Sequence, residues 1–379
     1  MIWCRFHPAS SCLLTLFCFF GTAIQAGAQL SSTEQRFLDL VEPIAQAPTE
    51  DFRLLPLVKM GGVGAGYRYQ IAFLSYGVVS LAHSDPDRTP HYRRLFLRLL
   101  DKMEHPTTQS FWKKSGYRGD GKSRDNIMYR GHLALMYALT HFSFGSTRDS
   151  EKFHKLVNSL HREMVSSPSG GICCEPDQLF IQCNTVALLA FSLHDRLHGT
   201  DYAASGHRLL RWAQQKIPVP GTQLFRDDYR MNNGSSSLQM AGYANAWTIS
   251  FLGAIPEYRE QALTMYRDWK QSFAVNTPGI AIARGAPEWP SSLEDAPREF
   301  ASATLCTFFG TLAAREANDR TFHRKLSRSL ATIELIRPAL NFLEPEDEKR
   351  ARLALYISLY ARTFRGWSTL LEKPHPIFE

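Results

Sequence analysis

Two cysteines in a polar and aromatic segment are suited to chemistry by their type and spacing. Cys174 and Cys183 lie nine residues apart, and Pro176 between them prevents one continuous helix from carrying both. We therefore expect Cys174 in a loop and Cys183 at the start of a helix, where backbone N–H groups favour an anionic thiolate. The two thiols are predicted either to face one cavity as reactive groups or to be inert buried cysteines or a disulfide.

Histidines offer a second set of candidate groups. His132 opens an apolar helix and is either a hydrogen-bonding core residue or the acid/base of a site, since the ordinary pKa of histidine, about 6.5, suits proton transfer at neutral pH. His194 and His198 have the spacing of a helical metal pair, but no H-E-x-x-H motif surrounds them. We predict no metal site.

Aromatic residues are candidates for lining an apolar pocket. Tyr243 and Trp247 lie four residues apart and share one helix face, although such stripes usually belong to the core. Further candidates are Tyr67, Tyr69, Phe73, Tyr76 and Trp112. No nucleotide-binding fingerprint or G-x-S-x-G motif is present, and no cofactor is expected.

Helices are predicted to position nearly all of these residues. The first follows a capping box at residues 32–35, and further helical stretches are separated by Gly, Pro, Asn and Ser clusters. We place them at residues 66–84, 88–104, 126–144, 149–166, 182–198, 201–216, 239–254, 256–272, 298–318, 319–333 and 348–371. Residues 279–283 are the only candidate strand. About a dozen helices with short links predict an all-α fold, an (α/α)6 barrel, as a single domain over residues 29–379.

The first 28 residues are typical of a cleaved secretory signal peptide. Arg5 precedes an apolar run at residues 13–20, and an A-x-A pattern ends at Ala28. This run is shorter than the roughly 20 residues of a membrane-spanning helix, and no later charge-free run reaches that length. We therefore expect a periplasmic or secreted mature chain without a membrane span.

Charge argues against a nucleic-acid partner. The sequence has 43 Lys and Arg against 36 Asp and Glu, a formal net charge of +7, but its basic residues are scattered without a run of five. A basic patch that would track a phosphate backbone is therefore not predicted.

Three strings resemble the linalool dehydratase/isomerase family, bacterial enzymes of monoterpene metabolism. They are DNIMYRGHL at residues 125–133, CEPDQLFIQCN at residues 174–184 and DRLHGTDY at residues 195–202. Their separations also agree with the family, and weaker similarity extends over roughly residues 66–371.

The resemblance implies an (α/α)6 barrel, assembled as a ring-shaped homo-oligomer. Such an enzyme interconverts a tertiary and a primary allylic terpene alcohol (linalool and geraniol) and dehydrates the tertiary alcohol to a diene such as myrcene, without a cofactor. By position, the resemblance implies catalytic roles for Tyr69, His132, Cys174 and Cys183. The implied substrate-binding residues are Met128, Phe180, Tyr243 and Trp247.

The sequence departs from the family upstream of Tyr69. There the family has an acidic residue and a second tyrosine that belong to the neighbouring subunit's site, and Asp51 is the nearest acidic candidate, although it lies too close to Tyr69. A cysteine pair that forms a disulfide in the family is also missing.

The implied reaction requires an acid, because hydroxide leaves poorly from a neutral carbon. We hypothesise that His132 and Tyr69 organise proton delivery, and that the faces of Phe180, Tyr243 and Trp247 stabilise the allylic cation by about 0.5–2 kcal/mol each. The cysteines either capture the allylic carbon as a thiolate or take the proton from the neighbouring methyl group.

Two other functions remain open on the sequence. An (α/α)6 glycan-acting hydrolase or epimerase needs a carboxylate pair across its cavity, for which Glu175 and Asp177 are the clustered candidates. A non-catalytic carrier of hydrophobic ligands would use the same apolar pocket without reactive groups.

Overall fold

The structure is a computed structural model that describes residues 30–55, 59–60, 63–64, 67–108, 126–236, 242–285, 296–340 and 345–372. The predicted signal peptide, residues 1–28, lies outside these described residues. Among them, no helix is both long enough and apolar enough to cross a bilayer.

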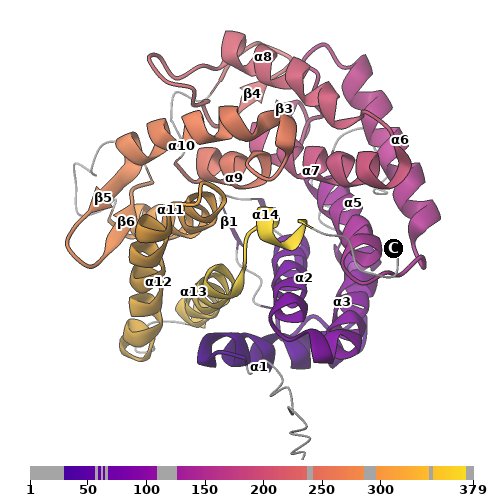
Figure 1. The fold of residues 1–379 in the computed structure, drawn as a ribbon. Helices are drawn as coiled ribbons and strands as arrows, with labels where there is room; N and C mark the ends of the chain where they lie inside the picture. Colours follow the sequence, from indigo (N-terminus) through magenta and orange to yellow (C-terminus); the bar gives the residue numbers. More distant parts are fainter. Residues whose placement is uncertain are drawn as a thin grey trace, which may run out of the picture.

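Six helices form a closed inner ring in which each contacts the next and the last returns to the first (Figure 1). In ring order they are α2 (Tyr67–Ser84), α5 (Ile127–Phe142), α7 (Ile181–His198), α9 (Gly242–Leu252), α11 (Ala296–Glu316) and α13 (Pro345–Thr363). The outer helices are α1 (Ser32–Gln46), α3 (Thr89–Glu104), α6 (Ser150–Ser166), α8 (Gly206–Lys216), α10 (Arg259–Phe273) and α12 (Arg320–Leu340). The predicted all-α toroid is confirmed.

The hydrophobic pattern explains which helices lie inside. In α5 every residue except His141 is buried, as is typical of a helix covered on all sides. In the outer helix α6 only one stripe is buried, at the helical spacing of Phe153, Val157, Leu160 and Met164. Inner helices can therefore direct side chains toward the centre of the ring.

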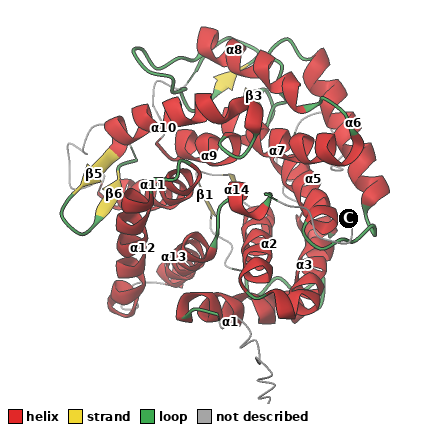
Figure 2. Ribbon diagram, in the orientation of Figure 1, coloured by secondary structure: helices red, strands yellow, loops and turns green. Residues whose placement is uncertain are grey.

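Strands are few and short among the described residues (Figure 2). The three antiparallel pairs join β1 (Lys59–Met60) to β2 (Val63–Gly64), β3 (Gln178–Leu179) to β4 (Tyr229–Arg230), and β5 (Ala274–Asn276) to β6 (Ala281–Ala283). The predicted strand at residues 279–283 corresponds to β6, and the β3–β4 pair places the segment after α8 beside the cysteine loop.

The ring closes where the first helix meets the end of the chain. The capping box of α1 is formed by Ser31 and Glu34, one residue earlier than predicted, because the Ser31 hydroxyl accepts the Glu34 N–H and the Glu34 carboxylate accepts the Ser31 N–H. The same carboxylate accepts hydrogen bonds from Ser84 and Arg365. Although burial opposes it, these hydrogen bonds lower the pKa of Glu34 to about 2, so this carboxylate ties α1 to α2 and to the residues after α13.

Candidate functional site

The amide of Asn184 fixes the cysteine loop to the first turn of α7. Its Nδ2 donates to the carbonyl oxygens of Ile172 (3.0 Å) and Phe180 (2.9 Å), and its Oδ1 accepts the Ile172 N–H (2.9 Å). Cys174 precedes a tight turn and Cys183 lies in the first turn of α7. The prediction of one cysteine in a loop and the other at a helix start is confirmed.

The two thiols lie together in the interior. Cys174 and Cys183 are free and only 3% and 2% exposed, and the two thiols are close enough for Cys174 to raise the pKa of Cys183. Burial, followed by the neighbouring Cys174, raises the pKa of Cys183 well above its usual value, and the positive charge of Arg68 only partly opposes this. The expectation that the helix start favours a thiolate is therefore wrong for Cys183, whose thiol is neutral at physiological pH.

His132 lies on α5 with its ring surrounded by aromatic side chains. Its Nδ1 shares a 2.7 Å hydrogen bond with the Tyr76 hydroxyl, and the rings of Tyr69 and Trp247 have centroids 6.1 and 6.0 Å away. Burial and the charge of Arg68 lower the pKa of His132 to about 3. A pKa matched to neutral pH was expected, but the imidazole is neutral there and is not the acid that protonates a hydroxyl.

The other ring nitrogen of His132 is available to a ligand. Within the described part of the chain, His132 Nε2 is buried without a hydrogen-bond partner, and so is Nε1 of the adjacent Trp247. Orphaned buried polar atoms are rare in folded proteins and concentrate where a ligand or water binds. These two nitrogens therefore mark a place where a polar group of a substrate would bind.

Arg68 is a buried charge of this site that sequence reasoning missed. It is fully buried on α2, and its guanidinium lies 4.8 Å from the ring centroid of Tyr69. Its positive charge adds to the lowering of the His132 pKa by burial. For Cys183 and Glu175 the same charge opposes burial, which raises their pKa values. A sequence signal existed, because Arg68 is the one Asp, Glu, Lys or Arg residue in the 18 residues of α2.

Asp227 is an acidic residue of the site that the sequence analysis also missed. Burial and the adjacent Asp228 raise its pKa to about 6, against the lowering effect of hydrogen bonds from Gln182 Nε2 (3.4 Å) and the Tyr243 hydroxyl (3.5 Å). The pKa of Tyr243 is in turn raised by burial, by Asp227 and by Cys183. A carboxylic acid thus contacts Gln182, the residue before Cys183, and Tyr243. Its sequence signal was the single Asp-Asp pair in the chain.

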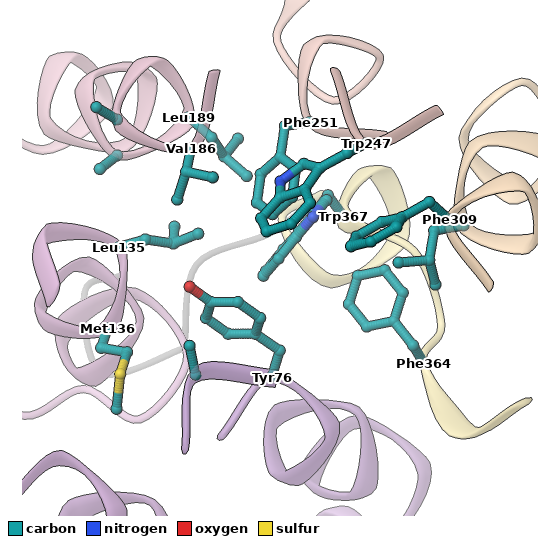
Figure 3. Packing of buried hydrophobic residues seen from close by; sticks show 14 of the residues in the cluster. Tyr76, Leu135, Met136, Val186, Leu189, Trp247, Phe251, Phe309, Phe364 and Trp367 are labelled. Atoms are coloured by element: carbon teal, nitrogen blue, oxygen red, sulfur yellow. The ribbon is translucent and has the colours of Figure 1, made fainter. Parts of the chain in front are cut away.

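Aromatic side chains form a wall beside these polar groups. Phe73 contacts both His132 and Trp247 with centroid separations of 5.7 and 5.6 Å, and Trp247 stacks on Phe309 at 4.4 Å. Figure 3 shows Tyr76 and the Trp247–Phe309 stack in this interior cluster. The faces of these rings provide the electron-rich surface that a developing cation would need.

The remaining predicted substrate-binding residues flank this wall. Met128 is buried one helical turn before His132, on the same face of α5. Phe180 is half-buried and immediately precedes α7, three residues before Cys183. All eight predicted site residues lie on four successive inner helices, α2, α5, α7 and α9, or in the loop before α7, which carries Cys174 and Phe180.

Asp51 lies apart from this cluster within the protomer. Its carboxylate pairs with Arg53 at 2.7 Å, and its backbone carbonyl accepts a hydrogen bond from Lys102 Nζ at 2.9 Å. The hydrogen bonds from Arg53 hold the pKa of Asp51 well below its usual value. Asp51 therefore takes no part in the arrangement around His132 in the same chain.

Buried histidines predict that the protein loses stability in acid. Burial lowers the pKa values of His132, His194 and His323 to about 3, 4 and 3, so between these values and the unfolded value of about 6.5 the unfolded chain binds more protons. Stability should be complete above about pH 6.5 and fall as the pH decreases, by up to about 1.4 kcal/mol per pH unit for the fully buried His132. Asp227, with its raised pKa, offsets part of this loss. Urea unfolding at several pH values checks the prediction, and a midpoint constant between pH 7 and 5 would contradict it.

Comparisons with known proteins give two kinds of match, one to a family and one to solved structures with a similar fold. The family model described as Linalool dehydratase/isomerase matches residues 68–333. Among solved structures, an α-amylase from Clostridium perfringens has a TM-score of 0.56 at 10% identity, covering 87% of this chain and 97% of its own. A GH76 α-mannanase from Bacteroides thetaiotaomicron has a TM-score of 0.53 at 14% identity, covering 88% and 95%. At these identities the two structures share the toroidal fold with this chain, and that likeness extends to the fold alone.

Proposed function

We propose, since the chain belongs to the linalool dehydratase/isomerase family, that it dehydrates and isomerises allylic terpene alcohols of the linalool and geraniol type without a cofactor. The family is an enzyme family. The observation that carries the substrate class is the juxtaposition of an acid, two thiols and a partnerless His132 Nε2 with a wall of aromatic rings.

Asp227 is the proposed general acid. An acid with a pKa of about 6 retains a substantial protonated fraction near neutral pH, whereas the imidazole of His132 is neutral there. The Tyr243 hydroxyl donates to the ionised Asp227, and both Asp227 and Cys183 raise its pKa. When Asp227 is protonated, this hydrogen bond is proposed to reverse, so that Asp227 donates to the Tyr243 oxygen and Tyr243 passes its own proton to the substrate oxygen. In this role Asp227 supplies, from within the chain, the acid that the family takes from a neighbouring subunit.

The thiols are proposed to act as neutral hydrogen-bond donors. With its raised pKa, Cys183 has little thiolate at neutral pH, which disfavours covalent capture of the allylic carbon. A thiol pair beside the departing oxygen would instead orient the hydroxyl toward the acid. Of the two roles left open for the cysteines, neither covalent capture nor proton abstraction is needed in this scheme.

The allylic cation is proposed to form against the aromatic wall. Protonation by Asp227 releases water and leaves a cation beside Tyr69, Phe73 and Trp247. Loss of a methyl proton to His132 Nε2 then gives the diene, and return of water to the other end of the allyl group gives the isomeric alcohol. In the dehydration the methyl proton passes from His132 to solvent and Asp227 takes up a proton from solvent, and in the isomerisation the added water returns its proton to Asp227. Both reactions therefore balance without a redox partner.

The glycan-acting alternative has less support from the residues. Glu175 and Asp177 lie on a single tight turn, in which Glu175 pairs with Gln178 and Asp177 has a left-handed backbone with φ of 63°. Residues on one turn do not supply acid and base on opposite sides of a glycosidic bond.

Two further features are proposed from the sequence and the family. Residues 1–28 act as a cleaved signal peptide, so the mature enzyme works in the periplasm or outside the cell, as a single barrel domain. It assembles as a ring-shaped homo-oligomer. Because Asp227 takes the role of the acid, the proposed mechanism does not need Asp51 as the acid of a neighbouring subunit's site.

A substrate pair tests the proposed chemistry. Linalool should yield a diene, whereas its 1,2-dihydro analogue should react at least about 100-fold more slowly, because a saturated tertiary alcohol cannot form the delocalised cation. Equal rates for the two alcohols, or release of sugars from an α-mannan oligosaccharide without any diene formation, would contradict the proposal.

A further inference from the structure

Three histidines from two neighbouring helices converge on the outer side of the ring. His154 of α6 faces His194 and His198, which lie four residues apart in the last turns of α7, and one ring nitrogen from each is within 4.8 Å of the others. His194 is buried, and His154 and His198 are exposed. The sequence offered only the His194–His198 pair, because His154 lies 40 residues earlier.

Hydrogen bonds fix the orientation of the buried member. The Asp195 carboxylate accepts the Thr200 hydroxyl proton as well as the backbone N–H groups of Tyr202 and Ala203. Because the only hydroxyl proton of Thr200 is directed to Asp195, the Thr200 oxygen must accept the 2.8 Å hydrogen bond from His194 Nδ1. The proton of a neutral His194 is therefore on Nδ1, and its Nε2 presents a lone pair to the cluster.

His194 is oriented as a metal ligand is, because its Nδ1–H is already held by the Thr200 oxygen and its Nε2 is left to bind an ion. Metal-binding histidines usually donate the other ring N–H to a carboxylate or an oxygen that holds the ring. His154 Nδ1 lies 3.0 Å from His194 Nε2. Two nitrogens bound to one tetrahedral Zn²⁺ at about 2.0–2.1 Å lie roughly 3.3 Å apart, so a small outward rotation of one ring would admit the ion.

A second hydrogen-bonded pair supports His154. Asn158 Nδ2 lies 2.8 Å from His154 Nε2, and Asn158 Oδ1 accepts the Tyr202 hydroxyl at 2.7 Å. Binding of a metal at Nδ1 moves the His154 proton to Nε2. Rotation of the Asn158 amide by half a turn would then let Oδ1 accept that proton, while the Tyr202 hydroxyl turns to accept from Nδ2.

We propose that His154, His194 and His198 form a binding site for a divalent transition-metal ion of the Zn²⁺ type, with water as the fourth ligand. Imidazole nitrogens are preferred ligands of such ions. A surface hollow of about 440 Å³, lined by Lys155, Asn158, Arg162 and Tyr202, adjoins the cluster at Asn158. The exposed side chains of His154 and His198 give a hydrated ion access from solvent. The ion would link α6 to the C-terminal end of α7. His194 lies about 16 Å along α7 from Cys183, so the metal site is separate from the proposed active site.

Calorimetric titration of the tag-free mature protein with Zn²⁺ tests this site directly. We expect one ion per chain, a higher melting temperature with Zn²⁺, and the intense visible bands of tetrahedral coordination when Co²⁺ is the probe. His154→Ala and His198→Ala should each weaken Zn²⁺ binding by at least about tenfold and remove the cobalt bands. Both replaced side chains are exposed, so the variants should fold as the wild type does.

His207→Ala serves as the matched control, because His207 is an exposed histidine on α8 outside the cluster. It should bind Zn²⁺ as tightly as the wild type. Wild-type affinity in the His154→Ala variant, or the absence of stoichiometric binding by the wild-type chain, would overturn the proposal. Neither readout uses catalytic activity, so failure of this site and failure of the proposed function are distinguishable.

Discussion

Replacement of Asp227 by asparagine is expected to lower the turnover of linalool by about 100- to 10,000-fold, the usual contribution of a positioned general acid. Asparagine preserves the size of the side chain, but it has no acidic proton to give. Its one oxygen can replace only one of the two carboxylate oxygens that accept from Gln182 and Tyr243, and its NH2 group can donate to the Tyr243 oxygen in place of the other hydrogen bond. The folded state should therefore persist, and circular dichroism with a melting curve checks this.

Asp228→Asn is the matched control for this prediction. Asp228 is the adjacent carboxylate, half-buried like Asp227, and its contact is with Gln178 of the cysteine loop. We expect this variant to retain turnover within a few-fold of the wild type. Similar activity of both variants at wild-type level would remove Asp227 from the mechanism.

The pH dependence follows from the raised pKa of Asp227. An acid catalyst must be protonated, so turnover by the wild type should decline as the pH rises through about 6. The residual activity of the Asp227→Asn variant should lack this decline. A rate that increases through the same range would mean that the ionised carboxylate, acting as a base, is the active form.

Cys174→Ala and Cys183→Ala are each expected to lower turnover by about 100-fold or more, because each removes a donor that orients the departing oxygen. Helix content and melting should change little. Cys173→Ala is the matched control, since Cys173 is a half-buried neighbour in the same loop, and it should retain activity. Measurement of initial rates with fully reduced proteins checks the prediction.

Oxidation tests the same pair without mutation. The two buried thiols are neighbours, so a mild oxidant should join them, reduce the intact mass by two hydrogens and abolish turnover until dithiothreitol restores it. Full activity of the oxidised chain would show that the cysteines hold the loop and that other groups perform the chemistry.

The toroid could be predicted from the sequence because the hydrophobic pattern that marks each helix lies within that helix. The buried stripe of α6 and the mostly apolar sequence of α5 follow directly from residue spacing, and their bounds differ from the predicted ones by two residues at most. The first capping box is offset by one residue, from Ser32 to Ser31, because α1 begins at Ser32 and the preceding serine, Ser31, is its N-cap.

The chemistry of the site was less accessible from the sequence, because it depends on long-range contacts. The low pKa of His132 comes from burial and from Arg68, and the high pKa of Cys183 comes from burial and from Cys174 against the opposing charge of Arg68. A linear pattern does not relate the position of Arg68 on α2 to α5 or α7. Asp227 is brought to Gln182 through the pairing of β3 with β4, two strands of two residues each. Such short strands leave no periodic signal.

Incubation of the reduced mature protein with linalool and with geraniol, under exclusion of air and followed by gas chromatography, tests the central claim most directly. We predict myrcene and geraniol from linalool, and linalool from geraniol, with both conversions greatly reduced in the Asp227→Asn variant. Absence of any conversion of either alcohol by the folded, reduced protein would contradict the proposed dehydratase and isomerase activity.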